Sequence, residues 1–139
     1  MRTLSLTSLA TAVAAALLLS GCASPIPTPN PQLAWIEPQP APDDELLIER
    51  VGDTRTPDGR YAEVAPGSYS LSLLYNFTAR FGLVTNNPKT LSCQIRFSPY
   101  DYAAGKRYYV RGSHDMGQPT VTLHNAQGDL LATGRSTCL

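Results

Sequence analysis

Apolar and polar residues alternate most regularly in two stretches of this chain, residues 69–75 and 91–97. In each stretch the larger apolar residues occupy the odd-numbered positions. The residues between them are serine, leucine, glutamine or arginine. This spacing has the two-residue period of a β-strand, in which successive side chains point to opposite faces of the sheet. We therefore expect two strands whose inward faces carry Tyr69, Leu71, Leu73 and Tyr75 in the first and Leu91, Cys93, Ile95 and Phe97 in the second.

Five further apolar stretches complete the pattern, and none of them shows a sustained 3.6-residue period. They are residues 45–51, 61–64, 106–111, 120–124 and 130–132. Turn sequences such as Pro57-Asp58-Gly59 stand between them, in which proline presets one φ angle and glycine accepts a positive one. The sequence therefore predicts an all-β domain over residues 43–139, a small antiparallel β-sandwich of about seven strands.

The N-terminus has the pattern of an export signal rather than of a folded domain. Arg2 precedes an uncharged apolar run, residues 4–19, with the length of a secretory signal. At about 1.5 Å per helical residue, such a run is too short to span a bilayer core of about 30 Å comfortably. We therefore expect the chain to be exported.

A cysteine stands immediately after this run, in the sequence Leu19-Ser20-Gly21-Cys22. The motif resembles the lipobox of bacterial lipoproteins, in which an aliphatic residue and two small residues precede the cysteine. The resemblance implies that a signal peptidase recognises Leu19, Ser20 and Gly21, that residues 1–21 are removed as a signal peptide, and that Cys22 carries palmitate-type acyl chains. The alternative is an ordinary secretory signal that ends near a cysteine.

The residues after this cysteine indicate where such a lipoprotein is anchored. Ala23 and Ser24 place no aspartate next to Cys22, which in lipoproteins of this kind favours the outer membrane. More than one acyl chain gives stable anchoring, because a single chain binds a bilayer only marginally. We therefore expect an outer-membrane lipoprotein whose domain faces the periplasm.

A proline-rich segment, residues 22–42, separates the expected anchor from the expected domain. Its prolines fix their own φ angles and move the preceding residues out of the helical region, so the segment should be extended and stiff. At about 3.1 Å per residue, it would hold the domain tens of ångströms from the bilayer. An apolar island, residues 33–36, interrupts it. This island either docks on a partner or the membrane, or forms a short strand that covers an edge of the domain.

Composition and cysteine count restrict the classes of partner. Eleven acidic and eleven basic residues balance to a net charge of zero, so the chain lacks the basic surface that binds nucleic acid. With Cys22 assigned to lipid, Cys93 and Cys138 remain. In an oxidising periplasm they are expected to form a disulfide. The alternatives are two buried thiols, or a C-terminal thiol that is available to another protein.

Residues that carry catalysis or bind metals do not gather in any recognisable motif. The two histidines, His114 and His124, lack the H-x-x-x-H spacing of metal ligands, and no C-x-x-C pair is present. No serine stands in a G-x-S-x-G sequence, and neither Cys93 nor Cys138 has a neighbouring base that would activate it. We therefore predict a protein that is not an enzyme and that has no catalytic residues, metal or cofactor.

Tyrosine and arginine gather in one part of the sequence, around Gly105. Both residue types are common in binding interfaces, because each combines a large contact area with hydrogen bonding. A second candidate is the segment 81–89, since loops on a rigid sandwich often carry recognition. The alternative is that the tyrosines pack in the core or cover its edge. The candidate binding residues are Tyr100, Tyr102, Arg107, Tyr109 and Arg111.

Three segments also resemble small envelope β-sandwiches of the transthyretin-like or carboxypeptidase-regulatory-like type. They are VAPGSYSLSLLY at 64–75, AAGKRYYV at 103–110 and VTLHNAQGDLLA at 121–132. Such domains include binding modules, assembly factors and structural modules, so two functions remain open. One is a non-catalytic module that docks another envelope protein or helps to assemble or maintain an envelope complex. The other is a module that binds a glycan or a peptidoglycan fragment.

Overall fold

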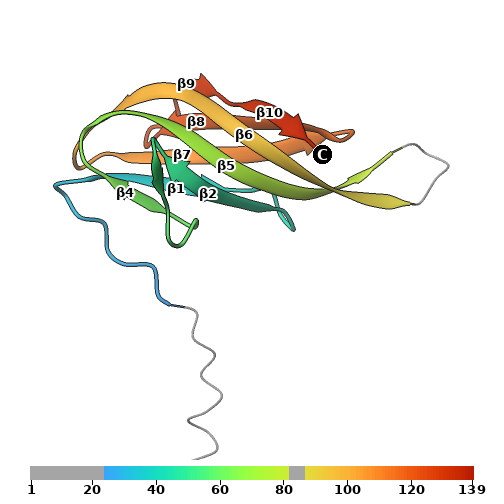
Figure 1. The fold of residues 1–139 in the computed structure, drawn as a ribbon, viewed down its shortest axis with the longest axis horizontal. Helices are drawn as coiled ribbons and strands as arrows, with labels where there is room; N and C mark the ends of the chain where they lie inside the picture. The colour runs from blue at the N-terminus through green and yellow to red at the C-terminus, as the bar shows by residue number, and fades with distance from the viewer. Residues whose placement is uncertain (1–23, 82–86) are drawn as a thin grey trace, which may run out of the picture.

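The computed structural model describes residues 24–81 and 87–139. Within these residues the chain forms ten strands and no helix, and the strands build two five-stranded sheets that pack face to face (Figure 1). The predicted all-β sandwich is confirmed. The expected signal peptide and lipid anchor, with Leu19, Ser20, Gly21 and Cys22, lie outside the described residues.

The two sheets have different strand orders. The first sheet has the order β4-β1-β7-β8-β9, and the second has the order β10-β6-β5-β2-β3. The strands of the first sheet are β1 (Ala34–Gln39), β4 (Ala62–Val64), β7 (Arg107–Asp115), β8 (Gln118–Asn125) and β9 (Leu130–Thr133). The strands of the second sheet are β2 (Glu45–Val51), β3 (Thr54–Arg55), β5 (Gly67–Arg80), β6 (Pro88–Tyr102) and β10 (Arg135–Cys138).

The inward-facing residues of both sheets form one apolar core. The two alternating stretches supply its centre, as the sequence predicted, and their fully buried residues are Leu71, Leu73, Tyr75, Cys93 and Ile95. Tyr69 is only partly buried, and the register of the β5 and β6 pair shifts between Tyr69 and Leu71. The alternation continues beyond the predicted strand to Phe77 and Ala79, so β5 reaches further along the sandwich than expected.

Seven of the ten strands match the predicted stretches, and β1, β3 and β10 are additional. β3 has only two residues, and all four residues of β10 are exposed, so neither strand has an apolar face that could alternate with a polar one. β1 lies inside the proline-rich segment, where Pro38 and Pro40 are unfavourable for a strand.

β1 corrects the expected domain boundary at residue 43. It lies between β4 and β7, and Ala34 and Ile36 are completely buried, so the folded domain begins by Ala34 at the latest. β1 is parallel to β7, so the first sheet is mixed rather than purely antiparallel. Pro38 has no N–H to donate, and it is tolerated because β4 pairs only with Ala34–Ile36 and leaves one side of β1 free at Pro38.

The residues before β1 also contact the domain, which differs from the expected free spacer. Arg60 Nη2 donates a hydrogen bond to the carbonyl oxygen of Ser24 at 2.8 Å. The backbone N–H of Asn30 donates to Glu63 Oε1 at 2.9 Å. Residues 24–33 therefore bind to the domain at two points.

On one side of the sandwich, which we call the closed edge, a single residue connects the two sheets. Gly134 joins β9 to β10, and its N–H donates to the carbonyl oxygen of Val121 at 2.8 Å. A Cβ atom at position 134 would lie 2.6 Å from Ile95 Cγ2, so no larger residue fits there without movement. The predicted disulfide between Cys93 and Cys138 is confirmed, with an S–S distance of 2.00 Å, and it fastens β10 to β6.

The opposite side, which we call the open edge, consists of β3, β4 and the loop 56–61 between them. β4 has three residues and pairs only with β1, and β3 has two residues and pairs only with β2. The loop packs back on β2, where the N–H of Ile48 donates to the carbonyl oxygen of Gly59 at 2.8 Å. In Figure 1, β9 and β10 lie along the upper side of the sandwich, and β4 lies along the lower side with the N-terminal segment.

Candidate functional site

The structure divides the five predicted binding residues between the core and the surface. Tyr102 has an exposed fraction of 3% and packs edge-on against Tyr108, with ring centroids 4.9 Å apart. Tyr100 is half-buried and packs edge-on against Tyr102 at 5.3 Å. The register shift between β5 and β6, which lies between Phe97 and Tyr100, turns Tyr102 inward, so Tyr100 and Tyr102 do not form an exposed aromatic platform.

Arg107, Tyr109 and Arg111 do share a surface, the outer face of the first sheet. They occupy alternate positions of β7, and the residues between them are buried. The parallel register sets Arg107 beside Trp35 and Arg111 beside Gln39 on β1. Arg111 Nε donates to Gln39 Oε1 at 3.3 Å, and Arg107 Cζ lies 5.9 Å from the centroid of the Trp35 ring. The structure thus joins these residues to β1, which contains residues 34–36 of the apolar island.

Trp35 is covered on this outer face. Its ring stacks on Tyr61 with centroids 4.7 Å apart and an angle of 4° between the planes. Its indole N–H donates to Glu37 Oε2 at 3.1 Å. The exposed fraction of Trp35 is only 3%, so the ring stabilises the contact between β1 and the start of β4 and offers no free face to a ligand.

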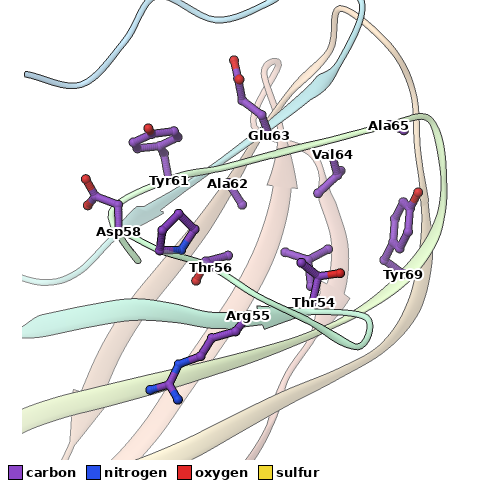
Figure 2. Close-up of a pocket in the computed structure, with 12 residues that line it drawn as sticks. Thr54, Arg55, Thr56, Asp58, Tyr61, Ala62, Glu63, Val64, Ala65 and Tyr69 are labelled. Carbon is purple, nitrogen blue, oxygen red and sulfur yellow. The ribbon is translucent and has the colours of Figure 1, made fainter.

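A groove with a volume of about 430 Å³ opens between the two sheets at the open edge (Figure 2). Ala62 and Val64 project from β4 towards Thr54 on β3, and Tyr69 stands at one end. More of the lining surface is apolar than polar. We call this feature the open-edge groove.

Charged groups stand at the rim of the open-edge groove rather than inside it. Asp58 pairs with Arg60, with Arg60 Nε 2.5 Å from Asp58 Oδ1. Their hydrogen bond lowers the pKa of the Asp58 carboxyl and raises the pKa of the Arg60 guanidinium. Arg55 and Glu63 point away from the groove in Figure 2. An apolar slot with a polar rim suits an aliphatic or aromatic side chain better than an ion.

The sequence gives little signal for this groove. Its residues Thr54, Ala62, Val64 and Tyr69 come from three strands, and none has a distinctive chemistry. The one local hint is the turn at residues 57–59, which separates β3 from β4. Only the arrangement of the two sheets brings these residues together.

A second polar cluster lies at the start of β2. Asp44 Oδ2 accepts a hydrogen bond from the Tyr75 hydroxyl at 2.6 Å and lies 3.5 Å from His114 Nε2. The His114 ring stacks on Phe77, with centroids 4.4 Å apart. Burial, and then the bond to Asp44, raise the pKa of the Tyr75 hydroxyl. A hydroxyl that retains its proton is a poor acid and nucleophile, so this arrangement fixes Asp44 beside β2 rather than forming a reactive centre.

The other residues singled out by the sequence do not extend the site. His124 contacts Thr122 Oγ1 through Nε2 at 2.9 Å and the carbonyl oxygen of Gly128 through Nδ1 at 3.1 Å, both within its own hairpin. In the candidate segment 81–89, residues 82–86 lie outside the described residues, and β6 begins at Pro88.

Comparisons with known proteins identify no relative. A scan against protein-family models, a search of curated proteins and a search of solved structures each gave no match. In the described part of the chain, no three histidine, cysteine, aspartate or glutamate side chains gather so that they could hold a metal ion. Residues 24–81 and 87–139 also contain no helix that is long and apolar enough to cross a membrane.

Proposed function

We propose that this chain is an outer-membrane lipoprotein, acylated at Cys22, whose periplasmic β-sandwich is a non-catalytic docking module for another envelope protein. The lipobox-like motif supports the anchoring. The observation that carries the docking role is the open-edge groove, an apolar slot of about 430 Å³ between two short strands.

The free edge of β4 favours a protein partner. Among the described strands β4 pairs only with β1, so its other side presents backbone groups without a strand partner. An extended segment of another protein can pair with such an edge and place every second side chain into an adjoining pocket. The apolar lining beside Ala62 and Val64 suits aliphatic or aromatic side chains on that segment.

The proposed anchoring is tested by measuring acylation and membrane association with and without Cys22. Cells that express the wild-type chain or Cys22→Ser are fed an alkyne analogue of palmitate and fractionated. We expect the wild-type protein to carry the label and to sediment with outer membranes, and the variant to be unlabelled and soluble. Labelling that persists in Cys22→Ser would contradict acylation at this residue.

The docking role is tested by photo-crosslinking in cells. A photoreactive residue at Thr54 or Ala65, both exposed in the lining of the groove, is compared with one at Ala126 in the exposed loop between β8 and β9. We expect one recurrent protein adduct at the two groove positions and none of it at Ala126. The same adduct profile at all three positions, or no protein adduct at the groove, would refute docking there.

Glycan binding remains a second candidate because Arg107, Tyr109 and Arg111 form one row on the outer face of β7. A half-exposed tyrosine between two guanidinium groups can stack on a sugar ring and hydrogen-bond to its hydroxyls. Sedimentation with purified peptidoglycan separates the two functions. Retention that is lost in Tyr109→Ala but kept in Ala65→Trp, which fills the groove, would support the glycan.

A further inference from the structure

The contacts of the proline-rich segment determine where the anchor leaves the domain. Ser24 is held by Arg60 at 2.8 Å, and Arg60 belongs to the loop 56–61 of the open edge. Asn30 is held by Glu63 of β4 at 2.9 Å, also on the open edge. The segment therefore contacts this one side of the sandwich at Asn30 and at Ser24, and Ser24 is two residues after Cys22.

The remaining distance to the anchor is short. Two fully extended residues cover about 7 Å, whereas a free segment from residue 22 to residue 33 would cover roughly 40 Å. We propose that the open edge faces the lipid bilayer in the anchored protein and forms a membrane contact surface. This inference rests on the acylation of Cys22 in the proposed function.

The side chains along this surface suit a neutral lipid interface. Ile26 has an exposed fraction of 50%, and Tyr61 lies on the same edge, in the loop that bears Arg60. Exposed aliphatic residues and tyrosines are typical of chains that rest at the headgroup region. Asp58 pairs with Arg60, so this guanidinium is not free to attract anionic lipids.

This orientation places the open-edge groove beside the bilayer and the closed edge on the far side. A partner that enters the groove must then present its extended segment at the membrane surface. The inference thus narrows the partner to an integral or lipid-anchored envelope protein.

The test uses the chain from Cys22 onward, which contains every described residue. Cys93 and Cys138 are joined in the disulfide, so Cys22 is the one free thiol and can be coupled to a maleimide lipid in phosphatidylcholine vesicles. A photoreactive residue is placed at Pro57 on the open edge or at Leu130 on β9, both of which are exposed. Adducts with lipid are then measured by mass spectrometry.

We expect a several-fold excess of lipid adduct at Pro57 over Leu130. A photoreactive residue at Ile26, four residues from the anchor, reports lipid contact whether or not the domain is docked. Equal yields at Pro57 and Leu130, together with adduct at Ile26, would overturn the proposal. Because coupling is chemical, this outcome is independent of acylation in cells and of the partner in the groove.

A pair of variants tests the contact that fixes the orientation. Arg60→Ala removes the bond to Ser24, whereas Arg55→Ala changes an exposed arginine of the same edge that has no bond to the segment. We expect the yield at Pro57 to fall towards that at Leu130 in Arg60→Ala and to stay high in Arg55→Ala. An unchanged excess at Pro57 in Arg60→Ala would show that this contact does not orient the domain.

Discussion

The closed edge and the open edge finish the same two sheets in opposite ways. At the closed edge one glycine carries the chain from sheet to sheet, and a disulfide fastens the last strand to its neighbour. At the open edge the loop 56–61 separates a two-residue strand from a three-residue strand, and a groove of about 430 Å³ remains between them.

The sandwich thus has one covalently fastened edge and one accessible edge. Exposed strand edges promote aggregation, and very short edge strands are one means of limiting it. β3 and β4 are short in this way, so the open edge is accessible over only a few residues and suits a specific partner better than uncontrolled pairing.

Removing the disulfide at the closed edge should cause the largest loss of stability. A cross-link between residues 45 positions apart restricts the unfolded chain, and its loss should cost about 4 kcal/mol in the chain-entropy description. We expect the double variant Cys93→Ala and Cys138→Ala to show this loss in urea unfolding. An unchanged unfolding midpoint would mean that the pairing of β10 with β6 suffices alone.

A smaller disruption of the closed edge is the variant Gly134→Val. The new side chain would meet Ile95 Cγ2 at 2.6 Å and Phe97 at 3.0 Å, so the sheets must separate locally. Overpacking of this kind costs about 1–3 kcal/mol, measured as a fall in the free energy of unfolding. Thr54→Val, at the exposed open edge, is the control, and it should change stability far less.

Two buried tyrosine hydroxyls differ in whether they have a hydrogen-bond partner. Tyr102 Oη is buried without a hydrogen-bond partner in the described structure, whereas Tyr75 Oη donates to Asp44. An unpaired buried polar group costs about 1–3 kcal/mol. We therefore expect Tyr102→Phe to raise the free energy of unfolding and Tyr75→Phe to lower it, both measured by urea unfolding.

The raised pKa values of these two tyrosine hydroxyls predict how the free energy of unfolding changes at alkaline pH. Burial is the main cause that raises the pKa of both hydroxyls, so they keep their protons in the folded state. The unfolded chain releases them near pH 10, so the free energy of unfolding should fall above about that pH. Tyr102→Phe should reduce this fall. The same slope in Tyr102→Phe as in the wild type would refute the contribution of Tyr102.

The smallest expected effect is at the open edge, in the variant Tyr61→Ala. Removing the ring that stacks on Trp35 should cost about 0.5–1.5 kcal/mol beyond the loss of buried area. Trp35 is the single tryptophan, so its fluorescence should shift to longer wavelength as water reaches it. Tyr109→Ala on the same outer face serves as control, and an equal shift there would mean that the stack does not shield Trp35.

Local patterns were sufficient to predict the centre of the fold. The alternation in β5 and β6 identified the buried face of each strand, because burial on one side of a sheet requires a two-residue period. The pairing of Cys93 with Cys138 followed from the number of cysteines and the expected oxidising compartment. Both predictions depended on residues close in sequence or on simple counting.

The place of β1, the burial of Tyr102 and the open-edge groove depended on contacts between distant segments. A short strand at residues 33–36 was one of two alternatives, but its place inside the sheet could not be predicted, because Pro38 is tolerated only where β4 leaves one side of β1 free. Tyr100 and Tyr102 were plausible surface residues because the alternation of residues 91–97, continued along the strand, points even-numbered residues outward; the register shift between β5 and β6 reverses this and turns Tyr102 inward. The open-edge groove required the positions of both sheets, since its lining residues come from separate strands.

The parallel pairing of β1 with β7 also constrains the order in which the chain acquires its structure during synthesis. Gln39 is made 72 residues before Arg111, its partner in the sheet. The ribosome therefore completes most of the domain before the second neighbour of β1 exists. Contacts between such distant positions form slowly, because a long loop must close first. Completion of the first sheet around β1 thus waits until β7 has been synthesised.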